Sequence, residues 1–427
     1  MDGGGDAAKT RMKTVCVTGA GGFVASWLVQ LLLSRGDYLV RGTVRDPGTL
    51  LLLSRSGDPK NAHLAALGGA SERLRLFKAD LLDPASVAAA VAGCDGVFHV
   101  ASPVPAVEPT NPDEVLVPAV TGTQNVLEAS HAASVRRVVV VSSVGAVIAN
   151  PSIPDGAVVD EDCWSDEDYC RTTKVQCSTR VLHHLYIYII CHSIYPVIVL
   201  CIHMTYHWSL TLESGHHINV YRQNWYCVSK TVAEREALAY GERTGTMDVV
   251  TVCPPWVLGP LLQPTVNATS MRFVTYLKGQ SVQFLDCLLA LLAGHLRIFQ
   301  AGMCVHNTRS LLSLLAYAGE NTEEKTRNMV DVRDVAAALV LTYETPQASG
   351  RRYICSAHAM RVSQTVGLVH SLRPDLKLLR YPRKFVQVED EKRVSSRRLQ
   401  ALGWKCRTVE ETLRDTVDSY KAAGIMN

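Results

Sequence analysis

The sequence has almost no net charge and no cysteines in closely spaced pairs. It carries 43 Lys and Arg residues against 40 Asp and Glu residues, for a formal net charge of +3 at pH 7. This balance argues against nucleic acid or an anionic membrane surface as the main partner. The 13 cysteines are scattered and include no CxxC pair of the kind that binds zinc. We therefore expect no disulfide framework and no metal site.

The amino-terminal end also lacks an apolar leader. Residues 1–14 are rich in glycine and polar side chains, so no hydrophobic core of a secretory signal is present there. Reduced thiols in the cytoplasm are then the simplest interpretation of the cysteines. The apolar stretch 185–202 is long enough for a minimal membrane span, but it contains His192 and Pro196 and has no basic flank. We predict a cytoplasmic protein without a membrane segment.

A large apolar fraction and a regular alternation of strand and helix patterns are present instead. Hydrophobic residues make up 47% of the 427 residues, which is enough for a sizeable core. Helical patterns separate short β-branched runs, and these runs cover residues 15–18, 38–44, 74–79, 96–100, 137–141 and 247–253. Such alternation predicts an α/β fold with a doubly wound parallel sheet of the Rossmann type and a smaller carboxyl-terminal substrate lobe. We expect residues 12–254, completed by 330–346, to form the nucleotide-binding domain, and residues 255–427 to form mainly the substrate lobe.

A glycine-rich turn joins the first predicted strand to the first predicted helix. Its pattern is Thr18-Gly19-x-x-Gly22-x-x-Ala25. Gly19 permits a tight turn, and Gly22 lets the backbone approach a pyrophosphate at the positive end of the helix. A glycine turn alone is also consistent with a plain loop, but the strand before it and the helix after it favour nucleotide binding. The expected dinucleotide contacts here are Thr18, Gly19, Gly22, Phe23 and Val24.

The end of the second predicted strand indicates which dinucleotide is bound. A site for NAD usually carries a carboxylate there, whereas this chain has Val44 followed by Arg45. A guanidinium suits a 2′-phosphate, so the sequence favours NADP. A solvated turn residue is the alternative interpretation of Arg45.

Tyr226 and Lys230 form a candidate catalytic pair. They are four residues apart in a predicted helix, so both project from one face. An ammonium one turn away favours the phenolate, which would pull the pKa of Tyr226 from about 10 toward neutrality. Tyr226 could then protonate a carbonyl oxygen as hydride arrives, while Ser143 hydrogen-bonds that oxygen. An ordinary amphipathic helix is the alternative for the YxxxK pattern alone.

Together these motifs resemble the extended short-chain dehydrogenase/reductase superfamily, which has the NAD-dependent epimerase/dehydratase fold. Residues 162–166, 224–227 and 258–264 are similar to the plant branch that holds cinnamoyl-CoA reductases and dihydroflavonol reductases. The resemblance implies an NADP-dependent oxidoreductase of phenylpropanoid (lignin) metabolism that reduces a carbonyl or an acyl-CoA thioester such as a hydroxycinnamoyl-CoA. It implies a ribose contact for Lys230, a 2′-phosphate contact for Lys60, and further cofactor contacts at Asp80, Leu81, Val100, Ala101, Ser102, Pro254, Val257 and Tyr226.

Two positions depart from the patterns of that branch. Dihydroflavonol reductases are expected to carry Asn where this chain has Ile148, and cinnamoyl-CoA reductases are expected to carry His and Lys where it has Arg272 and Thr275. Ile148 argues against a flavonoid substrate, and Arg272 could still meet a CoA phosphate. The alternatives are a catalytically silent nucleotide-binding relative and a reductase of dihydroflavonols or aldehydes.

Three stretches interrupt the sequence that the resemblance implies. They are residues 49–57, 175–223 and 280–319, and the second separates Lys174 from the Asn224-Trp225-Tyr226 motif. Valine codons begin with GT and one glutamine codon ends with AG, so Val175 and Gln223 fit the ends of an intron. We interpret the three stretches as translated introns or misjudged splice junctions, a hypothesis that sequencing of the transcript tests.

Overall fold

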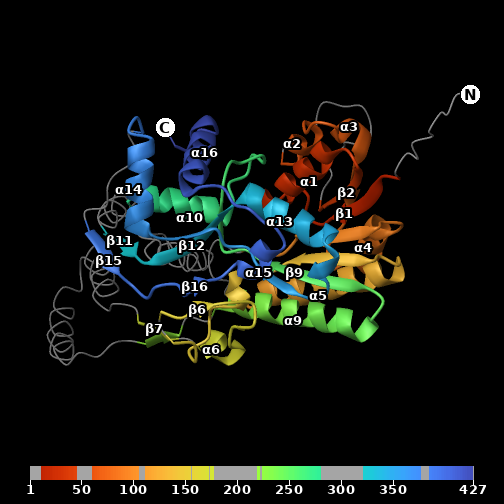
Figure 1. Cartoon of the computed structure of the whole chain (residues 1–427), viewed down its shortest axis with the longest axis horizontal. Coiled ribbons are helices and arrows are strands. Elements are labelled where there is room, and N and C mark those ends of the chain that lie inside the picture. Colours follow the sequence, from red (N-terminus) through yellow and green to blue (C-terminus); the bar gives the residue numbers. More distant parts are fainter. Residues whose placement is uncertain are drawn as a thin grey trace, which may run out of the picture.

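A seven-stranded parallel sheet organises the first part of the fold (Figure 1). This computed structural model describes residues 11–45, 60–104, 111–154, 156–172, 174–176, 219–221, 224–279, 321–376 and 384–426. The strand order is β13-β9-β5-β4-β1-β2-β3, and every neighbouring pair is parallel. The strands are β1 (Lys13–Val17), β2 (Tyr38–Val44), β3 (Leu74–Lys78), β4 (Gly96–His99), β5 (Arg137–Val141), β9 (Asp248–Cys253) and β13 (Arg352–Ile354). The predicted α/β class with a doubly wound sheet is confirmed.

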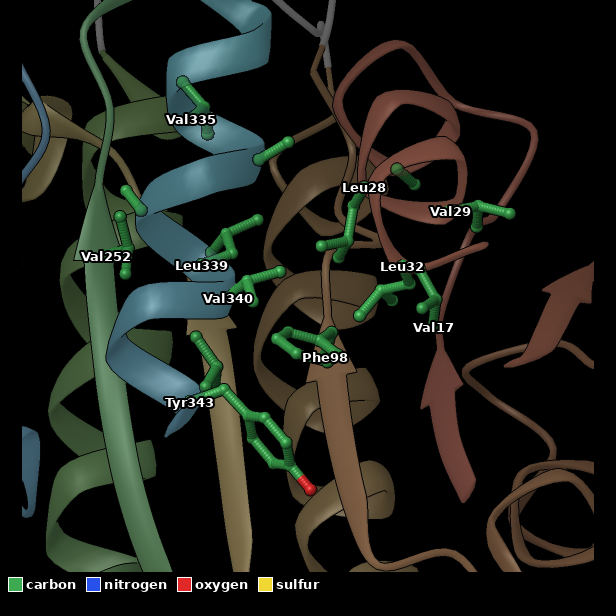
Figure 2. Packing of buried hydrophobic residues seen from close by; sticks show 14 of the residues in the cluster. Val17, Leu28, Val29, Leu32, Phe98, Val252, Val335, Leu339, Val340 and Tyr343 are labelled. Atoms are coloured by element: carbon green, nitrogen blue, oxygen red, sulfur yellow. The ribbon is translucent and has the colours of Figure 1, made fainter. Parts of the chain in front are cut away.

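Helices cover both faces of this sheet, because successive strand residues point to opposite sides. Val15 and Val17 of β1 belong to the apolar cluster that includes helices α1 (Phe23–Arg35) and α13 (Val332–Glu344). Figure 2 shows these two helices side by side above the strands. Cys16 belongs to the cluster on the opposite face. The helices of that cluster are α4 (Pro84–Val91), α5 (Asp113–Ala132) and α9 (Trp225–Thr244).

A second apolar core lies in the carboxyl-terminal part of the chain. Its helices are α10 (Ala268–Leu277), α14 (Val362–Leu372) and α16 (Val409–Ala422). A three-stranded sheet accompanies them, with the order β10 (Trp256–Leu258), β12 (Thr326–Asp331) and β14 (His358–Arg361). The smaller elements are α2 (Ala62–Ala65), α3 (Ala70–Arg73), α6 (Glu167–Thr172), α15 (Arg397–Ala401), the pair β11 (Asn321–Glu324) and β15 (Lys384–Gln387), and the pair β6 (Val158–Val159) and β16 (Arg393–Val394).

The seventh strand of the large sheet comes from the part of the chain that the sequence assigned to the substrate lobe. Strand β13 pairs with β9, with Arg352 opposite Thr251 and Ile354 opposite Cys253. It follows the segment 330–346 that was expected to complete the nucleotide-binding domain. We keep the two-lobe division as a prediction, with β13 added to the first lobe.

The two ends of the second insert lie side by side. Strand β7 (Lys174–Gln176) pairs antiparallel with β8 (Asn219–Tyr221), with Lys174 opposite Tyr221. Just beyond this pair, the backbone N–H of Asn224 donates to the carbonyl of Cys170 at 2.8 Å. Helices α6 and α9 are therefore neighbours although the insert separates them in sequence.

Several predictions fall on residues outside the described ranges. These are the inserts 49–57 and 280–319, residues 177–218 of the second insert, and the candidate membrane span 185–202. Within the described ranges, no helix is both long enough and apolar enough to span a bilayer. Those ranges also hold no group of three or more His, Cys, Asp or Glu side chains arranged for a metal ion.

Candidate active site

The first turn of α9 holds the predicted catalytic tyrosine. Asn224 begins this helix, because its side-chain oxygen accepts a hydrogen bond from the N–H of Cys227 at 3.1 Å. Lys230 lies one turn after Tyr226, and its Nζ is 5.8 Å from the centre of the tyrosine ring. That Nζ also donates to the carbonyl of Val141, at the end of β5, at 3.3 Å. The structure therefore places both side chains on one face of α9, beside the carboxyl end of β5.

Ser143 lies directly against Tyr226. It follows β5 and caps a short 3-10 turn by accepting the N–H of Gly145 at 3.0 Å, and its hydroxyl is close enough to the Tyr226 side chain to lower the pKa of that phenol. A Cβ on Gly145 would lie 3.4 Å from both Ser143 Oγ and Tyr226 Cε1, so the glycine lets the turn approach the helix closely. The carbonyl of Pro254 accepts the N–H of Val144 at 3.1 Å, which brings the end of β9 to the same place.

Burial controls the protonation of this group more strongly than the lysine does. Desolvation raises the pKa of Tyr226 to about 12, and the hydrogen bond from Ser143 only partly opposes it. Desolvation also lowers the pKa of Lys230 to about 8. The prediction that Lys230 pulls the pKa of Tyr226 toward neutrality is wrong for this structure, because the low-dielectric surroundings disfavour the phenolate. Tyr226 therefore keeps its proton, as a general acid requires.

The glycine-rich turn has the shape that a pyrophosphate needs. Gly19 adopts a left-handed φ of 65°, and a Cβ there would lie only 3.0 Å from the Cβ of Ala101. Gly22 begins helix α1 without a side-chain cap, and no acidic residue occupies the first turn of that helix. The backbone N–H groups of Phe23 and Val24, in the first turn of α1, therefore have no capping side chain and no acidic neighbour in that turn, which suits an anion. The residues present fit the phosphates of a dinucleotide.

Thr18 and His99 fix the strand ends beside this turn. Thr18 Oγ1 accepts the N–H groups of Val100 and Ala101, both at 3.0 Å, so its own proton goes to His99 Nδ1 at 3.0 Å. His99 Nε2 then donates to Thr123 at 3.0 Å, which makes the imidazole neutral; burial lowers its pKa to about 3. His99 and Thr123 are not among the predicted site residues, although His99 immediately precedes the predicted contacts Val100, Ala101 and Ser102.

The two residues predicted to contact the 2′-phosphate, Arg45 and Lys60, lie on either side of residues 46–59. Arg45 and Lys60 are both exposed, and residues 46–59 between them lie outside the described ranges. Asn61, next to Lys60, packs so closely on Gly21 that a Cβ on that glycine would collide with its side chain. Lys60 is therefore anchored beside the glycine-rich turn.

The other predicted contacts are spread over several strand ends. Asp80 and Leu81 follow β3, Pro254 follows β9, and Val257 is buried in β10. Ile148 is half-buried against the apolar cluster around Val144. Arg272 lies on α10 in the carboxyl-terminal part, where its charge lowers the pKa of Glu323 and of Tyr276, although desolvation raises that of Tyr276 overall.

A doubly wound sheet with a glycine-rich turn after β1 and a Ser–Tyr–Lys group at its carboxyl edge defines a Rossmann-type reductase. Residues 16–172 match the model of the 3-beta hydroxysteroid dehydrogenase/isomerase family. The chain is 38% identical over 419 residues to cinnamoyl-CoA reductase 2 of Medicago truncatula, covering 96% of this chain and 92% of that protein. It is 36% identical over 416 residues to cinnamoyl-CoA reductase 1 of Petunia hybrida, covering 96% and 93%. The crystal structure of vestitone reductase from alfalfa (Medicago sativa) matches with a TM-score of 0.61 and 25% identity, over 97% of this chain and 99% of that one. The chain belongs to the family of plant cinnamoyl-CoA reductases and their relatives, and it is an oxidoreductase.

Proposed function

We propose that this protein uses NADPH to reduce a hydroxycinnamoyl-CoA thioester or a closely related carbonyl compound. The observation that carries the proposal is the contact between Ser143 and Tyr226, with Lys230 one turn away, at the carboxyl edge of the sheet that also holds the glycine-rich turn. Ligands of doubly wound sheets bind at this edge. The names of the relatives supply the substrate class.

Three side chains divide the chemical work. Bound NADPH would supply the hydride that the carbonyl carbon accepts. Ser143 hydrogen-bonds the carbonyl oxygen and stabilises its developing charge, and Tyr226 donates its proton to that oxygen. Lys230, charged below a pKa of about 8, then stabilises the phenolate that remains. With a thioester, the hydroxyl proton of the thiohemiacetal returns to Tyr226 as the C–S bond breaks. The aldehyde leaves, and the CoA thiolate leaves and takes its proton from solvent.

The preference for NADPH over NADH rests on the end of β2. Val44 stands where a carboxylate would hold the ribose hydroxyls of NADH, and the exposed Arg45 follows it. A guanidinium pairs with a 2′-phosphate in a bidentate manner. Lys60, anchored beside Gly21 through Asn61, adds a second positive charge.

A reducing compartment suits the cysteines of the described residues. None of these cysteines forms a disulfide with another described residue, and most are buried. Free thiols persist in a reducing compartment, which supports our proposal that the protein works in the cytoplasm.

Turnover with matched substrates tests the proposed function and its alternatives. The protein is incubated with NADPH and hydroxycinnamoyl-CoA, an aliphatic acyl-CoA, an aldehyde or a dihydroflavonol, and NADPH loss is followed by absorbance. We expect turnover with the hydroxycinnamoyl thioester. NADPH binding without any turnover would instead identify a catalytically silent relative. Turnover with the dihydroflavonol alone would overturn the thioester assignment, against which Ile148 and its apolar surroundings argue.

A further inference from the structure

A buried carboxylate lies directly behind the candidate catalytic group. Glu234 is one turn after Lys230 on α9 and is 1% exposed. Its Oε2 accepts the hydroxyl of Ser142 at 2.7 Å, and its Oε1 accepts the hydroxyl of Thr251 at 2.6 Å. Arg352 of β13 donates to both oxygens, at 2.7 Å and 3.2 Å. One carboxylate therefore ties α9 to β5, β9 and β13.

The guanidinium of Arg352 also makes contacts beyond Glu234. Arg352 Nη1 donates to the carbonyls of Glu161 and Cys163, at 3.0 Å and 2.8 Å. The guanidinium carbon also lies 3.4 Å from the centre of the Trp164 ring. A buried ion pair offsets its desolvation only when its geometry is good and its remaining donors are satisfied, and this pair meets both conditions.

We propose that Glu234 and Arg352 are positioning residues of this active site: through Ser142 they fix the position of Ser143, and Glu234 supplies the buried negative charge that faces Lys230. The inference rests on the proposed reductase function and extends it to residues that do not touch the substrate.

The geometry for the first role is local. Ser142 is held by its hydroxyl on Glu234 and by its N–H, which donates to the carbonyl of Val252 at 2.8 Å. The next residue, Ser143, lies against Tyr226, which is on the same helix as Glu234. The carboxylate thus sets the spacing between the serine-bearing turn and α9.

The second role follows from the groups that surround Lys230. Its own helix contributes Tyr226 and Glu234, β9 contributes Cys253, and β4 contributes His99. Burial keeps the Cys253 thiol and the His99 ring neutral near pH 7. Among the groups named around the lysine, Glu234 is the carboxylate, and its charge opposes the desolvation that lowers the pKa of Lys230.

Replacing Glu234 by glutamine removes the negative charge of this side chain and keeps its size and shape nearly unchanged. For Glu234→Gln we expect kcat to fall on the order of 10- to 100-fold. The pH above which kcat and NADPH affinity decline should move down by about one unit, because Lys230 then lacks its counter-charge. Glu236→Gln, on the same helix but outside the network, makes the same change in charge and should leave both profiles unchanged. Matching profiles for Glu234→Gln and the wild type would overturn the proposal.

If Glu234→Gln does not fold, a second variant still tests the positioning role. Ser142→Ala keeps the ion pair and removes only its link to the serine-bearing turn. It should lower kcat while the NADPH affinity and the pH profile stay as in the wild type, and an unchanged kcat would overturn the positioning role. If the wild type binds NADPH but reduces no substrate, the proposed function fails. The pH dependence of NADPH affinity in the wild type and Glu234→Gln then still tests the charge that faces Lys230.

Discussion

Deleting residues 175–223 should stabilise the protein and leave its cofactor site intact. The structure already holds the residues on either side of this insert together, because the N–H of Asn224 donates to the carbonyl of Cys170 at 2.8 Å and the deletion keeps both residues. The deletion shortens the connection between Cys170 and Asn224 roughly tenfold. At about 0.6 kcal/mol for each doubling of loop length, the free energy of unfolding should rise by about 2 kcal/mol.

Denaturant unfolding measures this gain directly, and the melting temperature should rise by a few degrees. NADPH affinity should stay the same or improve, because the start of α9 is set by Asn224 and Cys170 and not by the insert. The control replaces residues 175–223 by a glycine–serine segment of equal length. That variant keeps the long loop, so its stability should match the wild type.

Loss of folding in the deletion variant would contradict the expected gain in stability. It would mean that residues 175–223 contribute packing that outweighs their loop-closure entropy. The interpretation of this insert as a translated intron would then fall as well. A stability gain equal in the deletion and glycine–serine variants would show that the original segment destabilises through its own sequence and not through its length.

Three further predictions concern the cofactor and the catalytic pair. Tyr226→Phe removes the proton donor, so kcat should fall by about 10²- to 10⁴-fold at unchanged NADPH affinity; steady-state kinetics with a near-normal kcat would exclude Tyr226 as the acid. Arg45→Glu should weaken NADPH binding far more than NADH binding in fluorescence titrations. Equal losses of the two affinities would show that Arg45 does not discriminate between NADPH and NADH. NADPH affinity should fall as the pH rises through about 8, because Lys230 loses its charge there. In Lys230→Met the fall in NADPH affinity near pH 8 should be absent. If that fall persists in Lys230→Met, another group causes it.

Local sequence patterns predicted the elements whose apolar runs are strong. The bounds of β2 at residues 38–44 and of β5 at 137–141 are confirmed. Strands buried on both faces read as continuous β-branched runs. The placement of Ser143 beside Tyr226 likewise follows from motifs at the ends of predicted elements.

The parts that the sequence did not predict depend on contacts between distant residues or on burial. Arg352 meets Glu234 across 118 positions in the sequence, and no local pattern marks β13 as a strand of the large sheet. The pKa of Tyr226 depends on desolvation, whereas the spacing to Lys230 indicates only that a positive charge is near. His99 shows the same limit, because its hydrogen bonds to Thr18 and Thr123 join separate elements.

The central claim is that Ser143, Tyr226 and Lys230 reduce a hydroxycinnamoyl thioester with NADPH. The most direct test quantifies the products by mass spectrometry after incubation of the wild type and Tyr226→Phe with NADPH and a hydroxycinnamoyl-CoA, at equal cofactor occupancy. We expect one aldehyde and one free CoA for each NADPH consumed by the wild type, and almost no product from Tyr226→Phe. Release of CoA without NADPH consumption, or equal product from both proteins, would contradict it.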